Sequence, residues 1–132
     1  MNYFIYSAAA LFLLTGCAAS SVKDIQEHNI YSESYTLSEN YLDVYRRAID
    51  ELSRCNNSNI IDGELYAIIQ KADIRFIIAG DIWALIQLEA INDEETKVDN
   101  YVYWSSWVEL VSRLKSFLLE DTPTCQKWKI GA

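Results

Sequence analysis

The chain has 132 residues, and its 19 acidic and 11 basic side chains give a formal net charge of −8 at pH 7. This length accommodates one small domain. Such an acidic surface argues against nucleic acid as a partner and against electrostatic docking on anionic lipid.

Residues 3–14 carry no charged side chain, and this apolar run has the length of a signal-peptide core. It is too short to cross a bilayer as a helix, because crossing requires about 20 apolar residues. The run ends in Leu14-Thr15-Gly16-Cys17. This motif resembles the lipobox of bacterial lipoproteins; an uncleaved anchor and a plain secretory signal are the alternative interpretations.

The resemblance implies that residues 1–16 are a cleaved signal peptide. Cys17, carrying diacylglycerol and palmitate, would then be the first residue of the mature protein. Several acyl chains hold a protein firmly on a membrane, since each buried methylene contributes about 0.8 kcal/mol. Enteric lipoproteins retained at the inner membrane have an aspartate after the cysteine, whereas this chain has Ala18 and Ala19. We therefore expect a lipid anchor in the bacterial outer membrane, with the protein on its periplasmic face.

Residues 17–30 show no apolar periodicity and are predicted to be the lipidated cysteine and a polar tether, followed by a single domain at residues 31–132. In that domain, residues 31–37 alternate with the period of a strand. Side chains at helical spacing follow, namely Tyr41, Tyr45, Ala48 and Leu52. Ser38 is the candidate cap of this helix, which is expected to end at Cys55.

Four more strands are predicted at residues 64–70, 73–79, 81–91 and 96–104, which are rich in Ile, Val and aromatic side chains. Their short connections favour an antiparallel meander. A second helix is predicted to begin at a capping box formed by Ser106 and Glu109. Its apolar face consists of Trp107, Leu110, Val111, Leu114 and Leu118, and Pro123 prevents its continuation.

Cys55 and Cys125 are predicted to form one disulfide, because an exported domain meets an oxidising compartment and Cys17 is acylated. The bond would close a loop of about 70 residues and stabilise the fold by on the order of 4 kcal/mol. A catalytic thiol is the alternative, and only His28, in the tether, could be its imidazole partner.

These elements predict an α+β domain with two layers. Its order is strand, helix, four strands, helix, and both helices cover one face of the antiparallel sheet. On the opposite face, strand phase brings together six candidate partner-binding residues: Tyr66, Ile77, Trp83, Leu85, Tyr101 and Tyr103. Ile82 is assigned to the helix-covered face.

An exposed patch rich in Tyr and Trp is typical of a contact surface. Two alternatives stay open. The tail after Cys125 or the tether could fold over the patch, or a slip of one residue in strand register could disperse it.

No catalytic chemistry is predicted. His28 is the single histidine, so the domain has no Ser-His-Asp arrangement, and too few ligands exist for zinc. The glycines are scattered and form no phosphate loop. Asp93-Glu94-Glu95 is interpreted as solvated charge rather than a calcium site. We expect a non-enzymatic protein without a metal or cofactor.

Several motifs extend the resemblance beyond the lipobox. They are the tyrosine-rich strand and helix ending at Cys55, Gly63-Glu64-Leu65-Tyr66, Ala90-Ile91-Asn92-Asp93 before Thr96-Lys97-Val98, Trp107 and Cys125. Together they resemble a family of small, functionally uncharacterised lipoproteins of Gram-negative bacteria, which implies no activity. The expected function is binding of an envelope protein or self-association. The alternatives are a lipid or small-molecule module with a cavity lined by Phe76, Val111 and Leu114, and, less favoured, a hydrolase with paired carboxylates.

Overall fold

The computed structural model describes residues 19–56 and 58–122. Its centre is a five-stranded antiparallel sheet with the strand order β1-β5-β4-β3-β2. The strands are β1 (Tyr31–Leu37), β2 (Ile61–Tyr66), β3 (Lys71–Ile78), β4 (Asp81–Asn92) and β5 (Glu95–Val102). The predicted α+β class with an antiparallel sheet is confirmed.

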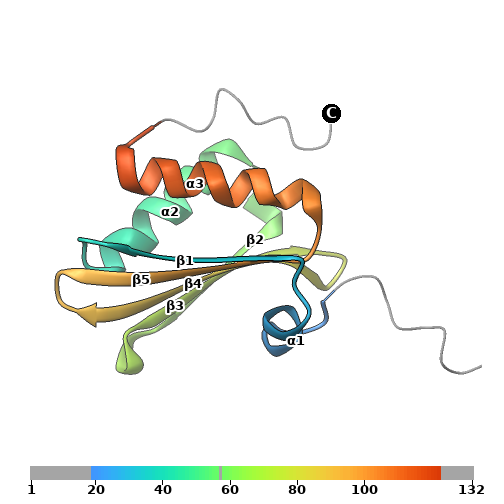
Figure 1. Ribbon diagram of the computed structural model, residues 1–132, viewed down its shortest axis with the longest axis horizontal. Coiled ribbons are helices and arrows are strands. Elements are labelled where there is room, and N and C mark those ends of the chain that lie inside the picture. Colours follow the sequence, from blue (N-terminus) through green and yellow to red (C-terminus); the bar gives the residue numbers. More distant parts are fainter. Residues whose placement is uncertain (1–18, 57, 123–132) are drawn as a thin grey trace, which may run out of the picture.

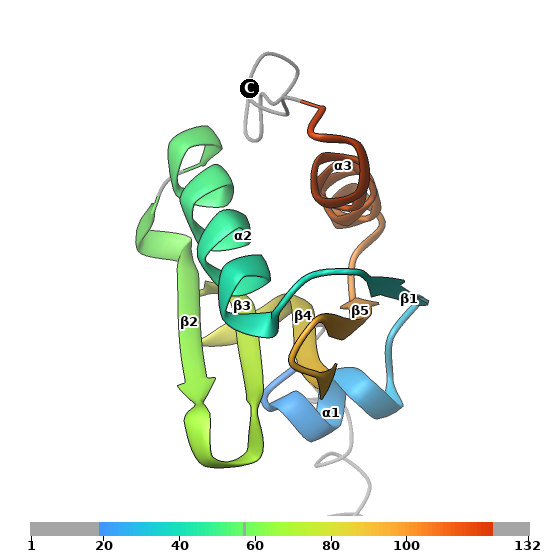
Figure 2. The same ribbon diagram turned by 90° about the vertical axis from the view of Figure 1, so that its left-hand side faces the viewer.

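Two long helices, α2 (Tyr41–Cys55) and α3 (Val108–Glu120), cover one face of the sheet, and the short helix α1 (Val22–Glu27) lies against the other (Figures 1 and 2). Three short 3-10 helices, η1 (Ser58–Ile60), η2 (Ala67–Ile69) and η3 (Ser105–Trp107), connect the elements. The predicted order of elements is wrong in two respects. Helix α1 precedes the first strand, and β1 pairs with β5, so the strands do not follow one another in chain order across the sheet.

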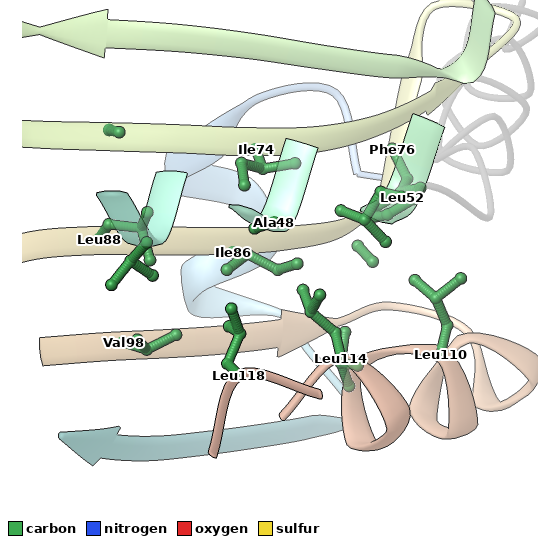
Figure 3. Close-up of a cluster of buried hydrophobic side chains, with 14 of the residues drawn as sticks. Ala48, Leu52, Ile74, Phe76, Ile86, Leu88, Val98, Leu110, Leu114 and Leu118 are labelled. Carbon is green, nitrogen blue, oxygen red and sulfur yellow. The ribbon is translucent and has the colours of Figure 1, made fainter. Parts of the chain in front are cut away.

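The main hydrophobic core lies between the sheet and helices α2 and α3. Figure 3 shows side chains of both helices meeting those of the central strands, with Leu52 of α2 next to Phe76 of β3. The Phe76 ring also packs on Trp107, with ring centroids 5.3 Å apart. The described core residues from the two helices are Val44, Ala48 and Leu52 of α2 and Leu110, Val111, Leu114 and Leu118 of α3.

The helix starts differ from the sequence prediction. Helix α2 is capped by Asn40, whose side chain accepts a hydrogen bond from the Leu42 amide at 2.9 Å, and not by Ser38. Helix α3 has no side-chain cap, so the predicted capping box is wrong. Ser106 lies in η3 instead, and Glu109, in the first turn of α3, pairs with Arg113 one turn later.

Strand β2 starts and ends earlier than predicted because the chain turns at η2. Gln70 follows this turn with φ 53°, in the left-handed region, and residue 71 already belongs to β3. The interpretation of residues 67–70 as strand is therefore wrong. Apolar residues alone cannot distinguish a strand from a short apolar turn.

Cys55 closes helix α2. Cys17 and Cys125 lie outside the described residues, so lipidation and the disulfide stay predictions.

Candidate functional site

Helix α1 covers the middle of the sheet face that α2 and α3 leave free. Ser21 caps it by accepting a hydrogen bond from the Asp24 amide at 3.1 Å. Just before the helix, the Ala19 carbonyl accepts a hydrogen bond from the Ile82 amide at 2.8 Å. On its inner side Ile25 is completely buried. This segment lies within the predicted tether, and it is held to the sheet.

The contact between α1 and the sheet forms a second hydrophobic cluster. Ala19, Ile25, Ile82 and Leu85 are its buried members, and Val22, Ile77, Tyr101 and Tyr103 pack around them. A hydrogen bond of 2.7 Å from Gln26 Nε2 to Gln87 Oε1 joins the helix to β4 at the edge of the cluster. Since one helical turn cannot hold its shape alone, α1 depends on this contact.

Four of the six predicted partner-binding residues therefore meet under or beside α1. Leu85 is completely buried, while Ile77, Tyr101 and Tyr103 are half-buried. The tether folds over this part of the face, which is one of the alternatives that the sequence left open. What remains accessible lies at the two ends of the sheet.

Trp83 is displaced by a β-bulge. The register between β3 and β4 shifts after Phe76, so that Ile77 pairs with Ile82 and no partner opposes Trp83. The assignment of Ile82 to the helix-covered face is therefore wrong, because this residue lies under α1. The half-buried Trp83 packs against the main core instead. A bulge inverts the phase of every residue on one side of it.

An aromatic cluster surrounds this bulge. The Trp83 ring meets Tyr103 and Trp104 edge to face, with centroids 6.4 and 6.0 Å apart. Its indole Nε1 donates a hydrogen bond of 3.4 Å to the Ile78 carbonyl. Trp104 remains 51% exposed. The cluster thus presents amphipathic rings at the sheet end where Ala19 is attached.

Tyr66, the sixth predicted residue, lies at the opposite end of the sheet, where β2 meets η2. A hydrogen bond to Glu64 raises the pKa of its phenol. Beside it, Arg75 pairs with Glu64 at 3.0 Å and with Asp62. The predicted patch is therefore divided, with Tyr66 far from the other aromatic residues.

The turn after Tyr66 carries an apolar tip that sequence analysis missed. Ile68 is 99% exposed and Ile69 59%, and Leu65 before them is also exposed. The Gln70 amide donates to the Ala67 carbonyl at 3.3 Å, and the Ala90 amide donates to the Gln70 carbonyl at 3.0 Å. Both bonds fix the turn, so the two isoleucines project into solvent from a defined backbone.

Several polar side chains lie between α3 and the edge of the sheet formed by β1. Lys115 pairs with Glu33, and this hydrogen bond is the main cause of the lowered pKa of Glu33. The Tyr31 hydroxyl donates to the same carboxylate at 2.7 Å. Burial raises the pKa of Tyr35 strongly, against an opposing effect of the Asn100 amide. Neither the Tyr35 hydroxyl nor the completely buried Asn100 amide completes a hydrogen bond.

The described part of the chain contains no cluster of three or more His, Cys, Asp or Glu that could hold a metal ion. His28 lies at the end of α1, where its Nδ1 is 2.9 Å from Asp24 Oδ1. Asp93, Glu94 and Glu95 line an open hollow. Asp43, in the first turn of α2, and Glu39, just before this helix, complete its acidic lining. Among residues 19–56 and 58–122, no helix is long and apolar enough to cross a membrane.

A comparison of the sequence with models of known protein families finds no match, and a comparison with curated proteins finds none either.

Proposed function

We propose that the chain is a lipid-anchored, non-enzymatic lipoprotein on the periplasmic face of the bacterial outer membrane. The proposal adds that it binds an envelope protein or a second copy of itself. Its support at the N-terminus is the apolar run that ends in Leu14-Thr15-Gly16-Cys17. Further support is that Glu33 and Arg75, two groups with shifted pKa values, form ion pairs within the sheet and between the sheet and α3.

The apolar tip formed by Leu65, Ile68 and Ile69 carries the binding part of this proposal. A fully exposed isoleucine next to a second exposed one is unfavourable in water, because burial of each methylene group would contribute about 0.8 kcal/mol of free energy. Contiguous exposed apolar side chains usually mark a contact site. Tyr66 flanks the tip, and Tyr is enriched at interface centres. The tip therefore replaces the covered centre of the sheet as the proposed contact.

The proposed Cys55–Cys125 disulfide is consistent with the reach of the chain. Asp121, at the end of α3, contacts Arg47 of α2 with 2.7 Å between Oδ1 and Nη2. Cys55 lies two turns farther along α2, a rise of about 12 Å. The four residues from Asp121 to Cys125 can span roughly 14 Å when extended. The length of this segment is therefore compatible with the pairing.

The alternative, a ligand cavity between sheet and helices, receives less support. Phe76, Val111 and Leu114 are all buried in the main core. Their packing in one cluster favours a structural role for these side chains.

The binding proposal is tested by placing a photo-crosslinking residue at position 68 in the full-length protein in its own envelope. The matched control carries the same residue at Leu119, which is 50% exposed on α3, outside the apolar tip. We expect a specific adduct at position 68 whose partner is identified by mass spectrometry, or a dimer. An adduct of equal yield at both positions, or none at position 68, would refute the contact.

A second variant, Ile68→Glu with Ile69→Glu, should abolish the adduct formed by a crosslinker placed at Tyr66. Because both isoleucines are exposed, the variant should fold like the wild type by circular dichroism.

A further inference from the structure

The chain is attached to the sheet immediately after the predicted lipid anchor. Ala19 is completely buried, and its carbonyl accepts a hydrogen bond from the Ile82 amide. Cys17 precedes Ala19 by two positions. Two residues span at most about 7 Å. If Cys17 carries acyl chains, the bilayer surface must therefore lie close to the point where Ala19 meets β4. The tether is too short to let the domain rotate freely.

One end of the sheet lies at this attachment point. In Figure 1 the β3–β4 turn, the start of β1 and the connection from β5 to α3 all lie at the right-hand end. Hydrogen bonds confirm the proximity, since the Ile30 amide donates to the Val102 carbonyl and the Tyr103 amide to the Trp83 carbonyl. Three exposed apolar side chains occur here, namely Ile30 (60%), Ile78 (41%) and Trp104 (51%).

The side chains at this end suit the headgroup region of a bilayer. Trp and Tyr combine an apolar ring with a polar group, and they are enriched where hydrocarbon meets water. The cluster offers three such rings, since Tyr103 and Trp104 each pack edge to face on Trp83. Ile30 and Ile78 add aliphatic surface beside it.

The distribution of charge favours the same orientation. Carboxylates gather at the opposite end, where Glu39 and Asp93–Glu95 line one hollow and Arg47 joins Glu39 to Asp121. At the end near Ala19, the β3–β4 turn carries the single acidic residue Asp81. An anionic membrane repels such an end. With the acidic end directed away from the lipid, the net charge of −8 opposes membrane contact least.

We propose that Trp104, together with Trp83, Tyr103, Ile30 and Ile78, rests in the headgroup region of the bilayer that holds Cys17. This inference rests on the proposed lipid anchor. The lipid then holds the domain with the end that carries Trp104 against the membrane. The apolar tip at Ile68 and Ile69 points away from the membrane. A protein covering the aromatic end instead is an outcome that the test detects.

The test uses the full-length protein purified from its membrane and reconstituted into vesicles of phosphatidylethanolamine and phosphatidylglycerol. Part of the lipid is brominated in its acyl chains, which quenches tryptophan fluorescence at short range. Mass spectrometry of the same sample first establishes whether Cys17 is acylated. We expect quenching in the wild type and a clear reduction of it in Trp104→Phe, with the remainder arising from Trp83.

The matched control is Trp107→Phe, at the same end of the sheet but buried under α3 with 6% exposure. It should keep the quenching of the wild type, and circular dichroism should show that both variants are folded. If the control variant unfolds, quenching of Trp104 by aqueous acrylamide replaces it, and this quenching should decrease on reconstitution.

The two proposals fail in different ways. An acylated protein whose Trp104 is not quenched by brominated lipid overturns the membrane contact and leaves the anchor intact. If Trp104 is shielded from acrylamide only in native envelopes, a protein covers this end and the bilayer assignment is wrong. A protein without acyl chains overturns the proposed function and this inference with it.

Discussion

Asp73 is a carboxylic acid on the α1-covered side of β3 that the structure nearly encloses. Only 7% of the residue is exposed, and burial raises the pKa of its carboxyl group, against a hydrogen bond of 3.1 Å from Gln87 Nε2. The folded state therefore holds this proton more tightly than the unfolded state. Consequently, the contribution of Asp73 makes the free energy of unfolding decrease as the pH rises from 3.8, the ordinary pKa of an aspartic acid, through the higher pKa of the folded state.

Asp73→Asn should remove this dependence. The asparagine Oδ1 can still accept the hydrogen bond from Gln87, and no charge has to be desolvated. We expect the variant to exceed the wild type in urea stability at pH 7 and to equal it near pH 3. Asp93→Asn, in an exposed turn, is the control and should change neither value. Equal stability of Asp73→Asn and wild type at both pH values would show that burial of this charge is not destabilising.

At the scale of elements, Gly63 determines how closely α2 approaches β2. A Cβ atom built at this position would lie 2.3 Å from the Tyr45 hydroxyl oxygen and 3.0 Å from Ile49 Cδ1. Gly63→Ala should therefore displace the Tyr45 ring and the end of the Ile49 side chain. It should destabilise the protein by about 1 kcal/mol, the low end of the range for overpacking, because both contacts are with the ends of flexible side chains. Urea unfolding gives this value directly.

A double-mutant cycle identifies the contact that causes the loss. Tyr45→Phe removes the nearest atom, and it should recover part of the stability in the Gly63→Ala background. Additive effects of the two substitutions would mean that the strain at Gly63 arises elsewhere.

The sequence predicted those elements whose periodicity is uninterrupted. Helix α2 was expected up to Cys55, and the phase of β5, with Tyr101 opposite the helices, is correct because no bulge interrupts this strand through Val102. Strand β4 is different, since the bulge at Trp83 inverts the phase of Ile82. Alternation is the only signal for strand phase in the sequence, and a bulge leaves no trace in it.

Two further features were missed for other reasons. Helix α1 has six residues and one buried side chain, Ile25, too few for a periodic pattern to be visible. The tip at Ile68 and Ile69 has the composition of a strand, and only the left-handed backbone of Gln70 turns it into a loop. The sequence therefore predicted one patch of six partner-binding residues. In the structure some of them lie under α1 at the centre of the sheet face, and the others lie at its two accessible ends.

For the whole molecule, α1 closes the second face of the sheet through Ile25. Replacing a fully buried isoleucine by alanine removes on the order of 2 kcal/mol or more of burial. Because α1 contacts the rest of the protein mainly through this cluster, Ile25→Ala should release α1 locally and leave the main core folded. Hydrogen exchange should accelerate at the Ile82 amide, which bonds to Ala19, and remain slow at core positions such as Ile86. Uniform acceleration at both positions would show that α1 and the sheet unfold as one unit.

The position of α1 also sets an order of events during folding. The segment that contains Ile25 leaves the ribosome first, while Leu85, which it packs against, is sixty residues farther along the chain. Strand β1 likewise cannot pair until β5 has been synthesised, because β5 is its neighbour at the edge of the described sheet. A helix of one or two turns does not persist in water without such a partner. Under the proposed lipid anchor, a modifying enzyme would therefore reach Cys17 before Ala19 is buried. Folding then buries both Ala19 and Ile25 against the sheet.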